Sequence, residues 1–180
     1  PCLPDTAAAG VLRGWDLCYD LESRGATLFE RFYRALFAEV FGSACGAEVA
    51  RFLLEETNTI ADFYANFDAV LLDARSVWYG SAGRDAVWRN VAAATLVEAA
   101  RPWGEEKRVS MRHLLYGGRL PRWLGFDRGP IALPGGRATV HQGQLYRAGG
   151  RATTFAPSYR IVTDFGENVA HTCLAGGPSD

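Results

Sequence analysis

Hydrophobic positions in the first half of the chain recur at steps of three and four residues, the spacing of one face of an α-helix. This spacing predicts a helix from Ser23 to Gly42. Asp20 or Ser23 can cap its start, because their side-chain oxygens accept amide hydrogens that lack a partner. The apolar residues of the predicted face are Ala26, Leu28, Phe29, Phe32, Tyr33, Leu36, Phe37, Val40 and Phe41.

Three more helices are predicted after the first, over residues 47–56, 60–77 and 84–100. Asn66 marks a predicted break in the second of these, and Pro102 ends the third because proline lacks an amide hydrogen and clashes with the preceding turn. The opening stretch "PCLPDTAAAG" predicts a frayed end.

The pattern changes after Pro102. Frequent glycines and prolines over residues 116–136 predict a long irregular loop. Beyond it, β-branched and aromatic residues alternate between turn signals and predict short strands joined by hairpins, including 159–165 and 169–174. We therefore expect an α+β fold, with a helical segment over 1–104 and a loop and antiparallel-hairpin segment over 105–180. Because these strands lack an evident partner, we expect the two segments together to be a fragment of a larger subunit.

Composition and charge exclude several classes of protein. The chain has 180 residues, 48% of them hydrophobic, and a formal net charge of −1. A near-neutral protein has no electrostatic reason to bind nucleic acid or an anionic membrane, and no apolar run reaches the roughly 20 residues that cross a bilayer. The four cysteines form no Cys-x-x-Cys pair, so we expect small buried residues in place of a disulfide framework. We predict neither a nucleic-acid nor a membrane partner.

Candidate chemistry is sparse. Phosphate-binding loops, dinucleotide fingerprints and the nucleophilic serine elbow are absent from the sequence. His113 and His141 are isolated, whereas His171 and Cys173 alternate along a predicted strand and so face the same way. This pair could be half of a zinc site or a Cys–His nucleophile, but packing or a surface role is the simpler interpretation.

The carboxylates also favour structural roles. Asp16 and Asp20 lie near a predicted helix start, where capping is the usual role. The adjacent pairs at 55–56 and 105–106 point in different directions or into solvent. Pro1 carries a secondary amine that could act as a base, although its surroundings predict a frayed end. We therefore predict no catalytic, cofactor-binding or metal-binding residue in the chain.

Four stretches nevertheless resemble the penicillin acylase family, and they occur in the family's order. The segment 12–42 contains a Trp-Asp pair before a Ser-initiated aromatic helix, and "WGEEKRVSMRHLL" resembles the family's Trp-Gly, strand and His block. The segment 124–143 resembles the family's Leu-Pro-Gly-Gly approach to a strand. The segment 156–180 is similar to the Pro-Ser-Tyr-Arg strand and final turn of the large subunit.

The resemblance implies that this is the C-terminal part of the large (β) subunit of an amide hydrolase with an N-terminal nucleophile and an αββα sandwich. In that family a precursor cleaves itself and exposes a serine whose α-amine acts as base. The implied partners are the remainder of the precursor and a small N-acyl substrate, with calcium in the parent protein and a periplasmic or extracellular location. The parent is expected to be an enzyme and this segment alone to be inactive. A non-catalytic binding or assembly module and a small self-contained hydrolase remain as alternatives.

Overall fold

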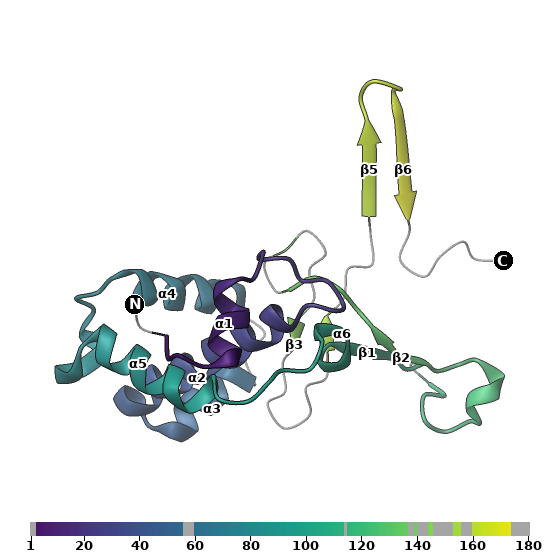
Figure 1. The fold of residues 1–180 in the computed structure, drawn as a ribbon. Helices are drawn as coiled ribbons and strands as arrows, with labels where there is room; N and C mark the ends of the chain where they lie inside the picture. Colours follow the sequence, from purple (N-terminus) through teal and green to yellow (C-terminus); the bar gives the residue numbers. More distant parts are fainter. Residues whose placement is uncertain are drawn as a thin grey trace.

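The structure is a computed structural model that describes residues 3–55, 60–113, 115–136, 139, 144–145, 153–155 and 160–173. It confirms a mixed helical and sheet fold with a helical first half (Figure 1). The helices are α1 (Ala7–Arg13), α2 (Arg24–Cys45), α3 (Ala47–Glu55), α4 (Ile60–Leu72), the 3-10 helix η1 (Val77–Ala82), α5 (Arg84–Thr95) and α6 (Trp103–Glu106).

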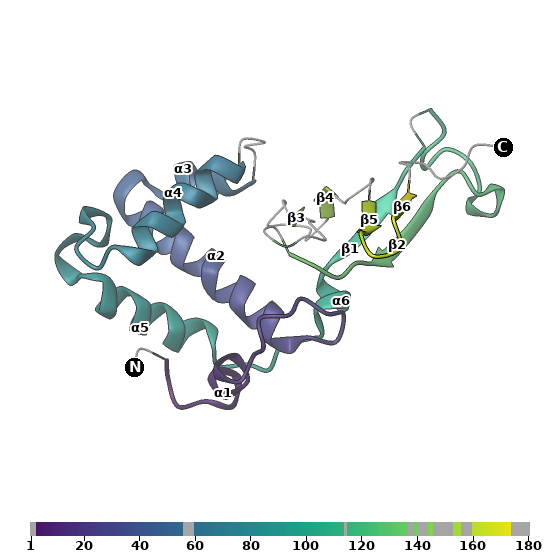
Figure 2. The same ribbon diagram turned by 90° about the horizontal axis from the view of Figure 1, so that it is seen from above.

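Helix α2 is the centre of the helical half and packs against α1, α3 and α5 (Figure 2). Ser23 caps its start by accepting the amide hydrogen of Ala26 at 3.2 Å. The predicted apolar face is confirmed, since every member is buried except the half-buried Phe29. Phe37 and Phe41 meet Phe67 of α4 with ring centroids 5.1 and 5.6 Å apart, and these rings form the middle of the core.

Two predictions about the ends of the helical half were wrong. The segment predicted to fray forms α1, because the Thr6 hydroxyl caps it at Ala9 and two alanines bury their side chains. Helix α5 stops at Thr95 and not at 100. Leu96 leaves the helix and fills the core with none of its surface exposed, and its carbonyl oxygen accepts the Thr6 hydroxyl at 2.6 Å.

Other helix boundaries also differ from the prediction. Helix α2 continues three residues past Gly42 and ends at Gly46, which adopts a φ of +89° that favours glycine. Helix α4 runs through Asn66 without a break and stops at Leu72, after which the chain enters η1.

The second half contains three two-stranded antiparallel sheets within the described residues. They pair β1 (Arg108–Met111) with β2 (Arg128–Ala132), β3 (Gln144–Leu145) with β4 (Thr153–Phe155), and β5 (Arg160–Asp164) with β6 (Val169–Cys173). The predicted hairpin strands are confirmed, whereas β2 lies inside the segment predicted to be a loop. The β5–β6 hairpin stands apart from the helices (Figure 1), and the side chains of residues 161–172 are exposed. Among the described helices, none has the length and apolar character needed to cross a membrane.

Candidate functional site

A buried lysine joins the helical half to the segment that follows β2. Lys107 is fully buried, and its Nζ donates to the carbonyl oxygens of Pro134 at 2.9 Å and Gly135 at 2.7 Å. The indole Nε1 of Trp103 donates to the same Gly135 oxygen at 2.9 Å. One backbone oxygen therefore receives both an ammonium and an indole hydrogen bond.

Helix α6 places these two donors. Trp103 and Lys107 are four residues apart, so they lie on one side of the helical turn. The backbone of α6 is fixed to the start of α2, because the Trp103 amide donates to Ser23 at 3.0 Å and the Gly104 amide donates to Leu21 at 2.7 Å. The packing at Gly104 is tight, since a Cβ there would lie 3.1 Å from a methyl carbon of Leu21 and would require that side chain to shift.

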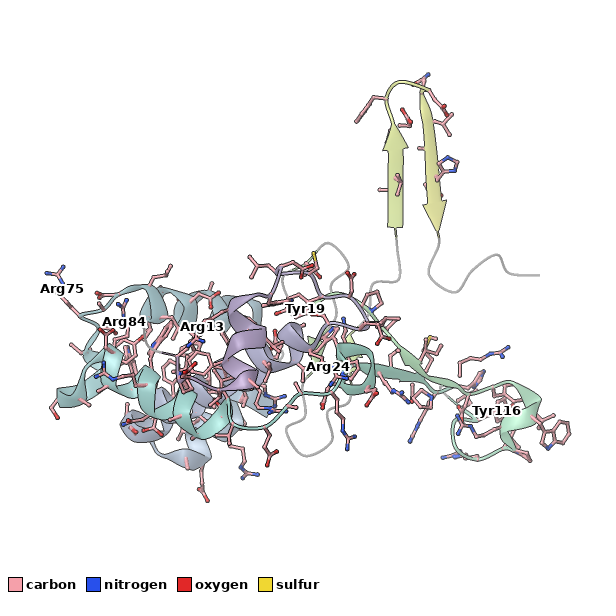
Figure 3. The ribbon with its side chains drawn as sticks, viewed as in Figure 1. Arg13, Tyr19, Arg24, Arg75, Arg84 and Tyr116 are labelled. Atoms are coloured by element: carbon pink, nitrogen blue, oxygen red, sulfur yellow. The ribbon has the colours of Figure 1, made fainter. Side chains whose placement is uncertain are left out.

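Tyr19, labelled in Figure 3, contacts this cluster from the loop between α1 and α2. Its hydroxyl donates to Glu30 at 2.8 Å, and its ring meets Trp103 edge-on at 5.4 Å. Its carbonyl oxygen accepts the Gly135 amide at 2.8 Å, and a Cβ on Gly136 would lie 2.8 Å from the ring. We call Tyr19, Glu30, Trp103, Lys107 and Gly135 the lysine node.

Burial determines the electrostatics of the node. It lowers the pKa of Lys107 from 10.5 to about 8, against the opposing influence of the Glu30 carboxylate. The amine is therefore mainly protonated at neutral pH, where it donates hydrogen bonds and is not a nucleophile. These properties suit a structural anchor for the Leu-Pro-Gly-Gly segment.

A second polar cluster organises the turn between β1 and β2. The Asp127 carboxylate accepts the amide hydrogens of His113 at 3.1 Å and Gly118 at 2.7 Å, and these bonds lower the pKa of Asp127. The Nδ1 atom of His113 accepts the amides of Leu115 and Tyr116, each at 3.2 Å, which places the proton of the neutral ring on Nε2. His113 therefore stabilises a turn.

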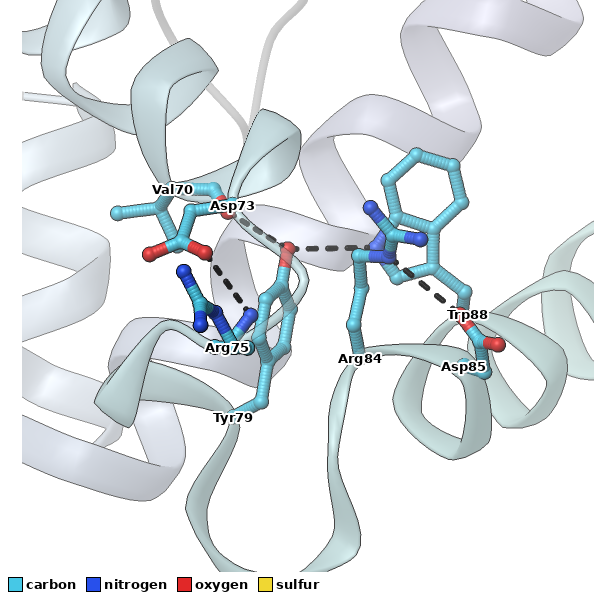
Figure 4. A network of polar contacts seen from close by, with 7 residues as sticks. All are labelled: Val70, Asp73, Arg75, Tyr79, Arg84, Asp85 and Trp88. Atoms are coloured by element: carbon cyan, nitrogen blue, oxygen red, sulfur yellow. Dashed lines mark hydrogen bonds and ion pairs between the residues drawn. The ribbon is translucent and has the colours of Figure 1, made fainter.

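A third cluster holds η1 against α4 and α5 (Figure 4). The Tyr79 hydroxyl donates to Val70 at 3.0 Å and accepts the indole hydrogen of Trp88 at 3.4 Å. Burial raises the pKa of Tyr79, so the phenol stays neutral. Nearby, Arg84 forms an ion pair with Asp85 at 3.3 Å. This cluster also has a packing role.

The two histidines that the structure describes, His113 and His171, belong to different parts of the fold. His113 lies after β1, whereas His171 is exposed on β6, the strand that also contains Cys173. His141 and the side chain of Cys173 lie outside the described residues. Within the described part, no three His, Cys, Asp or Glu side chains are grouped to hold a metal ion.

The carboxylates and cysteines partly depart from expectation. Asp16 accepts the Cys18 amide at 3.0 Å and organises a turn, so it does not cap α2. The pair at 105–106 was predicted in a loop but belongs to α6, where Glu106 is half-buried. Cys18 and Cys45 are exposed and not buried as predicted. Pro1, Cys2, Glu56 and the side chain of Glu55 lie outside the described set.

Sequence reasoning missed the lysine node and the role of Asp127. One signal for the node was available, because Lys107 is the single lysine of the chain and follows Trp103 by one helical turn. The carbonyl acceptors, 27 and 28 residues further along, leave no comparable trace in the sequence.

Comparison with known families gives one match, to the family described as penicillin amidase, over residues 3–180. The chain belongs to the penicillin amidase family. A search of curated proteins finds no match. Membership confirms the resemblance inferred from the four sequence blocks and assigns the chain an amidohydrolase-like scaffold.

The lysine node joins three of the four blocks that carried the penicillin amidase resemblance. The segment 12–42 supplies Tyr19 and Glu30, the segment 103–115 supplies Trp103 and Lys107, and the segment 124–143 supplies Gly135. The blocks are far apart in sequence and meet through hydrogen bonds at one buried place.

Proposed function

We propose that this chain is a scaffold segment of an amidohydrolase that cleaves the linear amide bond of N-acyl compounds. The catalytic N-terminal serine is proposed to lie on polypeptide outside this chain. The observation that carries the proposal is the meeting of three penicillin amidase blocks at the lysine node. In this role the lysine node would fix the position of Gly135 relative to the helical half.

Exposed apolar side chains support packing against further polypeptide. Ile161, Val162, Phe165 and Val169 of the β5–β6 hairpin are 54, 67, 91 and 39% exposed. Among the described residues, each strand of these two-stranded sheets also has one edge without a neighbouring strand, and such edges pair readily with other strands. The proposed partner is the remainder of the same precursor, with which these strands would complete an αββα sandwich.

The chemistry proposed for the parent protein follows from the N-terminal nucleophile. A terminal α-amine titrates near neutral pH and lies beside the serine hydroxyl, so it can take the hydroxyl proton during attack on the amide carbon. Backbone amides would hold the oxyanion that forms. A calcium ion is also proposed for the parent protein, by analogy with the family.

The test is to express the gene that encodes this chain and to determine the N-termini of the purified subunits by mass spectrometry. We expect a new N-terminal serine upstream of this chain and hydrolysis of a panel of chromogenic N-acyl amides, lost when that serine is replaced by alanine. Lys107→Met should lower the yield of processed enzyme while kcat per processed molecule is unchanged. An unprocessed protein without activity would favour the assembly-module alternative, and turnover by the 180-residue chain alone would refute the scaffold assignment.

A further inference from the structure

The β1–β2 hairpin and its connecting turn, residues 108–132, form an extension with a strongly basic character. We call it the basic arm. It contains five arginines and one acidic residue, a formal charge of +4, whereas the whole chain has −1. The arm points away from the helices (Figures 1 and 3, where Tyr116 marks it). The rest of the chain therefore carries −5.

A hollow of about 520 Å³ lies on the arm, and Arg112, Arg122 and Arg128 are among the residues that line it. Asp127 also lines the hollow and is its one acidic lining residue, so three arginines against one carboxylate leave an excess of positive charge. Trp123 is 82% exposed on the same turn. Arginines beside an exposed indole are typical of the residues that contribute most to protein interfaces.

The loop between α1 and α2 has the complementary composition. Within residues 16–22, which we call the acidic loop, Asp16, Asp20 and Glu22 are exposed and no basic residue occurs. Leu17 and Leu21 are 74 and 38% exposed. The negative charge of Asp16 raises the pKa of Cys18, as expected beside clustered carboxylates.

The acidic loop is held in a defined shape. Leu17 adopts a φ of +65°, an uncommon conformation for a residue with a branched side chain. The indole of Trp15 donates to the Cys18 carbonyl at 2.9 Å, and the Asp16 carboxylate accepts the Cys18 amide at 3.0 Å. These bonds direct Leu17 into solvent, so the loop presents an apolar tip between carboxylates.

We propose that the basic arm of one copy of this chain docks on the acidic loop of a second copy. Within the described part of the chain, the arginines of the arm and the carboxylates of the loop form no ion pair with each other, so neither set neutralises the other. Trp123 would pack on Leu17 and Leu21 while the charges surround this apolar contact. A two-fold axis would repeat the contact, because each copy has one arm and one loop. This inference goes beyond the proposed amide hydrolysis and does not depend on it.

Sedimentation velocity of the purified 180-residue chain tests the proposal. We expect a dimer at low ionic strength that dissociates as salt is raised to about 0.5 M, because salt screens exposed charges. Arg112→Glu with Arg128→Glu should weaken dimerisation at least about tenfold. The matched control reverses two exposed arginines of the helical half, Arg51→Glu with Arg89→Glu, and should remain dimeric.

A charge-swap experiment identifies the contacting surfaces. The loop variant Asp20→Arg with Glu22→Arg should also be monomeric, but an equimolar mixture with the arm variant should form a 1:1 heterodimer, since both contacts become attractive again. Far-ultraviolet circular dichroism verifies that each variant is folded. The proposal is overturned if the wild-type chain stays monomeric at low salt, if the control variant dissociates as readily as the arm variant, or if the mixture stays monomeric. Binding of the monomer to anionic vesicles or duplex DNA through the arm would overturn it as well.

Discussion

Replacement of Lys107 by methionine isolates the contribution of the buried ammonium group. Methionine keeps an unbranched apolar stem of similar length, so the substitution removes the charge and its two hydrogen bonds while leaving little empty space. The Gly135 carbonyl keeps its bond from the Trp103 indole. The variant therefore reports mainly on the balance between hydrogen bonding and the burial of a charge.

The expected loss can be estimated from the two opposing contributions. Hydrogen bonds that involve a charged group contribute about 1.5–3 kcal/mol each, so the two bonds from Lys107 contribute about 3–6 kcal/mol. The lowered pKa, from 10.5 to about 8, corresponds to a cost of at most about 3 kcal/mol for keeping the charge buried. The difference predicts that Lys107→Met is less stable than the wild type near pH 7 by up to about 3 kcal/mol.

The pH dependence gives a second and independent test. Between about pH 8 and pH 10.5 the unfolded chain still binds the lysine proton and the folded chain releases it, so the wild-type stability contributed by this group rises with pH. Below pH 8 both states are protonated and the contribution is constant. The stability difference between wild type and Lys107→Met should therefore be larger near pH 9.5 than near pH 7.

Urea unfolding followed by circular dichroism at both pH values measures this difference. Tyrosines and cysteines titrate in both proteins and cancel in the comparison. Arg101→Met removes an exposed positive charge six residues earlier and is the control, for which we expect less than about 0.5 kcal/mol at either pH. A Lys107→Met variant more stable than the wild type near pH 7, or a difference in stability that does not change with pH, would refute the reasoning.

Three further predictions concern other parts of the fold. Phe37→Ala opens a cavity at a fully buried position and should cost about 3–5 kcal/mol in urea unfolding, and a loss below about 1 kcal/mol would contradict the assigned core. Asp127→Asn should speed the hydrogen exchange of the His113 and Gly118 amides near neutral pH, because the carboxylate accepts both of them. The exchange rates of the wild type should approach those of the variant as the pH falls through the lowered pKa of Asp127. Equal rates at neutral pH would count against this role. Gly129 has a φ of +101°, and Gly129→Ala would put a Cβ 2.5 Å from the Val109 carbonyl oxygen. The amides of β1 and β2 should therefore lose their protection from hydrogen exchange. Unchanged protection would disprove the pairing of the two strands there.

The helices that sequence predicted best are those whose periodic face meets the core. The α2 face was predictable because eight of its nine residues are buried in the folded protein. Helix α5 ended early for a reason that no local pattern reveals: Leu96 is needed in the core, and its carbonyl is bound by Thr6, 90 residues away in sequence. Contacts between residues far apart in sequence therefore ended α5 before the stop signal at Pro102, and they ordered a start of the chain that was expected to fray.

The same limit applies to the lysine node. A single lysine is expected on the surface, because burying an ammonium group is costly unless acceptors surround it. Here the acceptors are the backbone carbonyl groups of Pro134 and Gly135 in the Leu-Pro-Gly-Gly turn. Every residue has a backbone carbonyl group, so the identity of these residues did not predict that they would bind Lys107. The resemblance to a family located the three blocks correctly but gave no reason why they belong together, and the hydrogen bonds of Gly135 supply that reason.

The position of Trp103 makes it an intrinsic fluorescence probe of this protein. Among the five tryptophans, all within the described residues, Trp103 alone is in the buried class, with 2% of its surface exposed. Its indole donates to the Gly135 carbonyl oxygen and meets the Tyr19 ring, so release of the glycine turn would hydrate the indole and shift its emission to longer wavelength. Detachment of the second half from the first could thus be followed in real time without any label.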